Sequence, residues 1–200
     1  FYSMTPERKE RLSAVLNKRQ NNITVVLENV SDPHNVSAVM RTCDAVGVQE
    51  VYVLMSKIPR HNKWGKKSSS SAAQWLTVHQ FTDAVACFAA LRKKYSRILT
   101  THLGELAVSL YDTDFTNSVA IVFGNEHDGV SQEIRAMADG DLVIPQVGFI
   151  RSLNISVACA VTLYEAFRQK SRAGHYAHRQ LNDESFHDLL SKWGIEEKEE

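Results

Sequence analysis

A strand–helix–strand unit near the start of the chain most constrains the fold. Residues 23–27 (ITVVL) are apolar and mostly β-branched, which is typical of a buried strand. A helical pattern follows from about Asn35 to Val46 and ends at Gly47, and residues 51–55 form a second apolar run. Strands joined through a helix normally run parallel, because an antiparallel pair needs only a short turn. The unit therefore predicts an α/β protein whose sheet is at least partly parallel.

The alternation of strands and helices continues along the chain. Further apolar or alternating runs predict four more strands, at residues 77–81, 98–101, 119–123 and 142–144. Cap residues predict helix starts in the intervening segments, at Thr5, Asp83 and Ser131. Six strands alternating with helices predict an α/β fold, with a mostly parallel sheet flanked by helices.

Composition divides the chain into a central domain and two extensions. Residues 21–170 contain all six predicted strands, so they are expected to form the domain. Residues 1–20 are expected to be a basic helical extension with a thin apolar stripe. Residues 171–200 are expected to be a second helical extension that ends in an acidic tail.

A strand–loop–helix stretch at residues 141–169 is the strongest candidate for a ligand site. Pro145 must end the strand because proline cannot donate to a sheet ladder. Ser152 and Asn154 are both good N-caps for the helix that follows. That helix is apolar on nearly every side, so we expect it to be buried. Open parallel sheets place ligands where a strand's carboxyl end leads into a helix N-terminus.

Charge is segregated although the formal net charge is zero. Most basic residues fall in four clusters, at residues 8–19, 57–67, 92–97 and 168–179. Solvated helix ends would explain any one cluster, but four of them favour a polyanionic partner such as nucleic acid.

Cysteine usage and hydropathy indicate the compartment. The three cysteines form no Cys-x-x-Cys pair and lie among apolar neighbours, which favours core thiols in a reducing, cytoplasmic setting. No apolar run approaches the roughly 20 residues that a membrane-spanning helix needs, so no membrane association is expected.

Several common site motifs are missing from the sequence. The loop after the first strand, ENVSDPHN, has no glycine, which argues against a dinucleotide fingerprint. There is no GxxxxGK[ST], no GxSxG and no Cys/His set with zinc spacing, so no metal is expected. Three polar loops remain, each after a predicted buried strand, at residues 29–41, 124–131 and 146–154.

These loops hold three segments that resemble a known family. PHNVSAVMRTCDAVGV, IVFGNEHDGVS and IPQVGFIRSLNISVACAVTLYEA are similar to the three motifs of the SPOUT class of RNA methyltransferases. The similarity is greatest to the TrmH group, the tRNA guanosine-18 2′-O-methyltransferases. It extends over about residues 5–179, and departs locally at Gln146 and at His127-Asp128.

The resemblance implies a fold, a cofactor and partners that the residue patterns do not show. It implies a deep C-terminal trefoil knot, in which the stretch 141–169 threads through a loop of the preceding chain. It also implies S-adenosylmethionine as cofactor, tRNA as substrate and a homodimer.

The resemblance also assigns roles to individual residues. The catalytic region corresponds to Arg41, Asn35, Glu126, Ser152 and Asn154. The cofactor contacts correspond to Thr101, Gly124, Ile144 and Leu153. The expected RNA contacts are Arg8, Arg11, Arg19 and Arg168, with Lys63, Lys66 and Ser69 as further candidates.

Structural roles compete with several of these assignments. Arg41 has Ser37 and Asp44 at helical spacing, so an Arg–Asp pair on a polar face would also explain it. Asn35 could be an ordinary N-cap. Trp75 is expected to be a core residue more than a base-stacking one.

The resemblance gives Arg41 the role of the family's essential arginine, which is proposed to help deprotonate the ribose 2′-hydroxyl. The difficulty is that the pKa of arginine exceeds about 12, which makes it a poor base in water. We expect its guanidinium to bind a phosphate and to stabilise the developing 2′-alkoxide, with base action only if it is desolvated.

Two other functions remain open at this point. One is methylation of another tRNA position or of ribosomal RNA by an enzyme of the same class. The other is a non-catalytic RNA-binding protein on this fold.

Overall fold

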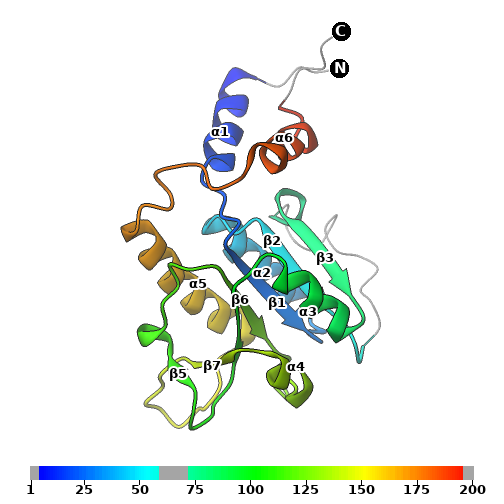
Figure 1. Cartoon of the computed structure of the whole chain (residues 1–200), viewed down its shortest axis with the longest axis vertical. Coiled ribbons are helices and arrows are strands. Elements are labelled where there is room, and N and C mark those ends of the chain that lie inside the picture. Colours follow the sequence, from blue (N-terminus) through cyan, green and yellow to red (C-terminus); the bar gives the residue numbers. More distant parts are fainter. Residues whose placement is uncertain (1–4, 59–71, 196–200) are drawn as a thin grey trace.

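The computed structural model describes residues 5–58 and 72–195 and contains a seven-stranded sheet (Figure 1). The strands are β1 (Ile23–Glu28), β2 (Glu50–Leu54), β3 (Thr77–Phe81), β4 (Arg97–Thr101), β5 (Val108–Ser109), β6 (Val119–Phe123) and β7 (Gly140–Val143). Their order across the sheet is β3-β2-β1-β6-β4-β7-β5, and every pair is parallel. The predicted α/β class and parallel sheet are confirmed.

Six α-helices accompany the sheet in the described part of the chain. They are α1 (Pro6–Leu16), α2 (Pro33–Ala45), α3 (Ala84–Arg92), α4 (Gln132–Met137), α5 (Ile155–Arg172) and α6 (Asp183–Lys192). Two short 3₁₀ helices are η1 (Ala72–Trp75) and η2 (Leu110–Asp112). None of these helices is both long and apolar enough to span a bilayer.

The helices cover both faces of the sheet because the strand side chains alternate. Val25 and Leu27 of β1 belong to a core cluster with residues of α2 and α5. Val26, between them, belongs to a second cluster with residues of α3 and α4. The result is three layers, with α2 and α5 opposite α3 and α4 (Figure 1).

The six predicted strands are all present, and the seventh, β5, is the one that sequence analysis missed. It contains only Val108 and Ser109, which is too short to show an alternating pattern. β7 lies between β4 and β5, so β5 extends the sheet edge next to the strand that leads into the candidate site.

The N-cap of α2 differs from expectation. Asp32 caps this helix, and its carboxylate accepts a hydrogen bond of 2.9 Å from the backbone N–H of His34. Pro33 takes the first helical position, where its missing N–H costs nothing. The interpretation of Asn35 as the N-cap is therefore wrong, and its side chain is available for other contacts.

Helix α5 is buried on one face only, so the expectation that it is buried all round is wrong. Ile155, Cys159 and Leu163 are in the core, whereas Val157 and Tyr164 are 47% and 53% exposed. The exposed face holds apolar side chains that this chain does not cover.

Helices α1 and α6 lie side by side at one end of the molecule (Figure 1). They share a small core built from Leu16, Leu181, Leu189 and Trp193, separate from the two clusters on the sheet. The two predicted extensions therefore pack against each other, with Trp75 of η1 partly buried against them.

Candidate active site

The three polar loops meet at the carboxyl edge of the sheet. The side-chain amide of Asn154, the N-cap of α5, donates to Oδ1 of Asn35 at 3.1 Å. The amide of Asn35, in the first turn of α2, donates to Oε1 of Glu126 in the loop after β6. Parallel strands end at the same edge, which is why residues 91 and 119 positions apart in sequence come into contact.

The hydrogen bonds of this network all donate in one direction, from Asn154 through Asn35 to Glu126. Oδ1 of Asn154 already accepts from the backbone N–H of Ser156 at 2.9 Å and from its Oγ at 2.6 Å. That leaves the Nδ2 group of Asn154 to donate to Asn35, which in turn donates to the carboxylate of Glu126. The network therefore fixes three polar side chains from three loops relative to one another.

A cavity of about 330 Å³ adjoins the network. It is lined by the ends of β4, β6 and β7 and the loops that follow them. Its lining includes all four residues expected to contact the cofactor, Thr101, Gly124, Ile144 and Leu153. Glu126 and Ser152 from the expected catalytic set also line it.

Gly124 is required by the backbone around the cavity. A Cβ atom at this position would lie 1.9 Å from the carbonyl carbon of Gly129 and 2.2 Å from the backbone nitrogen of Val130. Gly148 is under no such constraint, because a Cβ there would meet no atom within 4 Å.

Two residues that sequence analysis missed, Glu28 and Asn29, bind the loops that follow β6 and β2. Glu28, only 2% exposed, accepts a hydrogen bond of 2.9 Å from the backbone N–H of Ser131. Asn29 has a positive φ of 51° and accepts from the backbone N–H of Lys57 at 2.9 Å. The sequence signal that could have identified them is an acid and an asparagine directly after an apolar strand.

Arg41 lies at an exposed position on α2 and, like Asn35, is not among the described residues that line the cavity. The residue offered as its structural partner, Asp44, makes a 2.5 Å ion pair with Arg19 from the segment after α1. Ser152 is exposed and precedes the cap, so of the two predicted N-caps for α5 only Asn154 is confirmed.

The expected RNA contacts fall into three groups. Arg8 and Arg11 are exposed on α1. Arg168 binds the carboxylate of Glu165 through two nitrogens, at 2.6 and 2.8 Å. Lys63, Lys66 and Ser69 lie outside the described residues.

Arg19 is the exception among these residues, because its side chain is fully buried and paired with Asp44. In this arrangement Arg19 does not present its guanidinium to solvent as Arg8 and Arg11 do, and its RNA contact stays a prediction. The sequence pattern could not show that Arg19 would turn inward.

Asp141 in β7, next to the cavity-lining Leu142, has a shifted pKa. Burial favours its neutral form, but hydrogen bonds from Arg135 and Thr100 outweigh that effect and lower its pKa. Among the described residues, no group of three or more His, Cys, Asp or Glu side chains could hold a metal ion. The absence of a metal requirement stays a prediction.

A parallel sheet with a cavity and a polar network at its carboxyl edge is typical of α/β enzymes that bind a small ligand at this edge. The profile of the SpoU rRNA Methylase family matches residues 22–164, and the chain belongs to that family.

Relatives of known name are similar to this protein over most of its length. The tRNA (guanosine(18)-2′-O)-methyltransferase of Thermus thermophilus is 39% identical over 191 residues, covering 94% of this chain and 96% of that protein. The enzyme of the same name from Escherichia coli is 42% identical, covering 86% of this chain and 75% of that protein. A solved structure, the A. aeolicus TrmH/SpoU tRNA modifying enzyme, superposes with a TM-score of 0.85 at 36% identity, covering 94% of each chain.

Proposed function

We propose that this protein transfers a methyl group from S-adenosylmethionine to the ribose 2′-oxygen of guanosine 18 in the D-loop of tRNA. The observation that supports this most is the Asn154–Asn35–Glu126 network beside a cavity that all four expected cofactor residues line. The Thermus thermophilus enzyme with this activity matches 94% of the chain, so the match reaches into both extensions.

The cavity fits the cofactor in size and in construction. Its volume of about 330 Å³ lies within the roughly 300–1,000 Å³ typical of small-molecule sites. Gly124 allows two backbone segments to approach so closely that no side chain fits between them. Thr101, Gly124, Ile144 and Leu153 would hold the cofactor largely through backbone and apolar contacts. When bound, the cofactor supplies an activated methyl group on a sulfonium sulfur.

The chain's own residues must position the ribose and manage its proton. Glu126, Asn35 and Asn154 hold the three loops in register, so the cavity wall is organised before RNA binds. Ser152, which lines the cavity, contacts the target nucleotide in this proposal. Arg41 stabilises the developing 2′-alkoxide, because a guanidinium that stays charged is better suited to bind an oxyanion than to remove a proton.

RNA binding is assigned to Arg8 and Arg11 on α1 and to Arg168 on α5, which reach solvent and contact phosphates in this proposal. Lys63, Lys66 and Ser69, outside the described residues, are included from the sequence alone. Residues 1–20 and 171–200 act as RNA-binding extensions of the catalytic domain at residues 21–170. Cytoplasmic location is consistent with the three buried free cysteines.

The family's trefoil knot is part of the proposal. β7 lies between β4 and β5, although β4 and β5 are consecutive in the chain. The chain therefore passes between two strands that residues 102–107 connect, as a threaded topology requires.

A homodimer is also part of the proposal. Val147 and Phe149 in the loop before α5 are completely exposed, and Val157 and Tyr164 on α5 are about half exposed. Apolar side chains grouped in this way are typical of a surface that a partner covers. Sedimentation of Val157→Glu, with Val85→Glu on α3 as the control, tests this: only the first is expected to give monomers.

Mapping ribose methylation in tRNA from a strain lacking this protein tests the activity itself. We expect guanosine 18 to lose its methyl group and to regain it with the wild-type gene. An unchanged guanosine 18, with methylation lost elsewhere in tRNA or in ribosomal RNA, would favour the alternative suggested by the family's description as rRNA methylases. No binding of S-adenosylmethionine by calorimetry would instead favour a non-catalytic RNA-binding protein.

A further inference from the structure

A second cavity, away from the active-site edge, has a lining suited to a nucleotide. It has a volume of about 550 Å³ and lies between α1, α6 and η1. Its wall combines arginines, apolar side chains and two indole rings, from Arg8, Arg11, Leu12, Val15, Trp75 and Trp193. Neither the catalytic network nor the first cavity uses any of these residues.

The aromatic part of this cavity is held in a defined arrangement. The rings of Trp75 and Trp193 meet edge to face, with 5.3 Å between their centroids. The guanidinium of Arg19 lies over the Trp193 ring at 5.3 Å and is itself fixed by Asp44. This packing orders Trp193 from one side, and Trp75 remains only partly buried.

Two side-chain N–H donors in the cavity lining have no hydrogen-bond partner among the described residues. Nε1 of Trp193 and Nε of Arg19 are buried and make no hydrogen bond. Both residues line the cavity and are 6% and 0% exposed. Buried donors are nearly always paired, so two unpaired ones beside a cavity indicate that something with acceptor atoms belongs there.

The second cavity has arginines at its rim and apolar side chains inside it. Arg8 and Arg11 are exposed. Of the two acids in the lining, Glu7 lies beside them on α1, and Asp44 is paired with Arg19. A nucleotide matches this combination, because its phosphate suits arginine and its base offers a π-face and ring acceptors to indoles.

We propose that this second cavity binds one unpaired nucleotide of the RNA substrate, with the base against Trp75 and the phosphate at Arg8 and Arg11. The inference depends on the proposed function only in taking the ligand from tRNA. It gives Trp75 a role in RNA binding that its position in the small α1–α6 core would not suggest.

The test measures tRNA affinity and S-adenosylmethionine affinity separately in the full-length protein. Trp75→Ala is expected to weaken binding of an unmodified tRNA transcript about tenfold, as loss of one base–aromatic stack does. Trp75→Phe is expected to keep most of the affinity, because phenylalanine preserves a stacking face. Neither change is expected to alter calorimetric binding of S-adenosylmethionine.

A second variant tests the cavity without removing an indole. Val15, 39% exposed, lines the cavity, and Val15→Phe would fill part of it. Val85→Phe, at a 64% exposed site on α3, is the matched control. We expect Val15→Phe to weaken tRNA binding like Trp75→Ala, with the control unchanged and the melting temperatures of the two valine variants close to that of wild type.

Salt dependence separates stacking from charge. Trp75→Ala should lower affinity equally at every salt concentration, whereas Arg8→Ala should reduce the slope of log K against log salt by about one. Wild-type tRNA affinity in Trp75→Ala, or a loss there with no loss in Val15→Phe, would overturn the proposal. Failure of the proposed function looks different, since wild-type protein would then bind tRNA and leave guanosine 18 unmethylated.

Discussion

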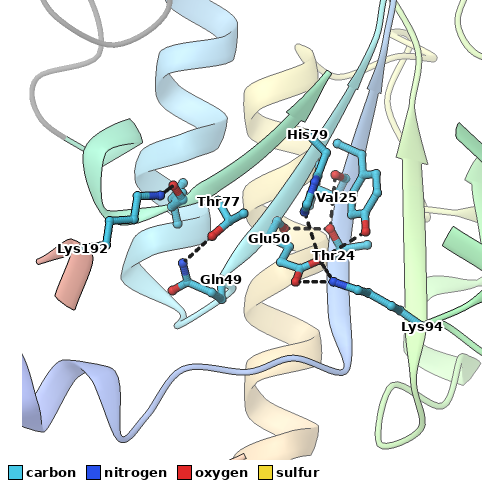
Figure 2. Close-up of polar contacts among 10 residues, drawn as sticks. Thr24, Val25, Gln49, Glu50, Thr77, His79, Lys94 and Lys192 are labelled. Atoms are coloured by element: carbon cyan, nitrogen blue, oxygen red, sulfur yellow. Dashed lines mark hydrogen bonds and ion pairs between the residues drawn. The ribbon is translucent and has the colours of Figure 1, made fainter. Parts of the chain in front are cut away.

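The two ends of the parallel sheet each hold a carboxylate in a polar cluster, but the clusters differ in how completely that carboxylate is satisfied. At the amino end, Glu50 accepts from Lys94 at 2.7 and 3.0 Å and from the hydroxyl of Tyr52 at 3.1 Å, with His79 at 3.3 Å (Figure 2). At the carboxyl end, Glu126 accepts from Asn35 and lines an open cavity.

The difference indicates what each cluster does. A carboxylate surrounded by donors has little capacity left for a ligand, so the Glu50 cluster joins β2, β3 and the end of α3. A carboxylate that orients one amide beside a cavity can respond to a ligand, and α2 and α5 place polar groups around it. We therefore expect substitutions at the carboxyl end to change activity and those at the amino end to change stability.

The largest effect should come from Asn35→Ala, which removes the middle of the Asn154–Asn35–Glu126 network. We expect the single-turnover methylation rate to fall by about 10²–10³-fold, the usual cost of losing a positioned polar group in an active site. The melting temperature should change little, because Asn35 does not cap α2. A rate within threefold of wild type would contradict the role given to the network.

Gly124→Ala should act first on the cofactor site. The new methyl group would overlap the backbone of Gly129, so the loop after β6 must shift. We expect affinity for S-adenosylmethionine to fall by at least about tenfold, since such sites depend on close backbone approach. Gly148→Ala is the matched control, because open space surrounds that position. Equal cofactor affinity in both variants would show that the close approach is unimportant.

Glu50→Gln should do the reverse and reduce stability while sparing cofactor binding. Burial disfavours the charged carboxylate, but hydrogen bonds from His79 and Lys94 outweigh it and lower the pKa of Glu50 to about 2. Because the pKa of Glu50 is lower in the folded than in the unfolded protein, its charge stabilises the fold at pH values above the unfolded pKa near 4.5. That stabilisation is lost as the pH falls toward 2. We expect a loss of about 2 kcal/mol at pH 7 in denaturant unfolding, shrinking below about pH 4.

Parallel unfolding curves for wild type and Glu50→Gln between pH 7 and pH 3 would check this linkage. If the two free energies of unfolding stay separated by the same amount across that range, the carboxylate charge is not the stabilising element.

The smallest effect should come from Ser156→Ala. It removes one of the two donors that orient Asn154, and the backbone N–H of Ser156 keeps the other at 2.9 Å. We expect a fall of less than about tenfold in the methylation rate and no change in tRNA affinity, since a single neutral hydrogen bond contributes about 1 kcal/mol. A loss as large as that of Asn35→Ala would place the orienting role in Ser156 instead.

Sequence analysis predicted the sheet well because its strands are short apolar runs between clear turn and cap signals. It missed β5, whose two residues show no period. It identified three polar loops that follow buried strands, and the structure brings residues of all three together because parallel strands end at one edge. The network itself could not be predicted, because which amide faces which carboxylate depends on the positions of α2 and α5.

Three local arrangements that the sequence pattern does not show share one cause, namely that tertiary packing decides between equivalent local choices. Asp32-Pro33 takes the cap position of α2 from Asn35. Arg19 turns inward to Asp44 because the extensions bury it. One face of α5 remains exposed, and apolar composition alone cannot distinguish a core helix from one that awaits a partner surface.

The central claim is that the network and its cavity direct methyl transfer to one ribose oxygen. Its most direct test is transfer of labelled methyl from S-adenosylmethionine to an unmodified tRNA transcript, compared with a transcript that has 2′-deoxyguanosine at position 18. The account predicts one methyl group per tRNA, located on the ribose of guanosine 18, and none on the deoxy transcript. Equal labelling of both transcripts, or no labelling by protein that binds the cofactor, would contradict it.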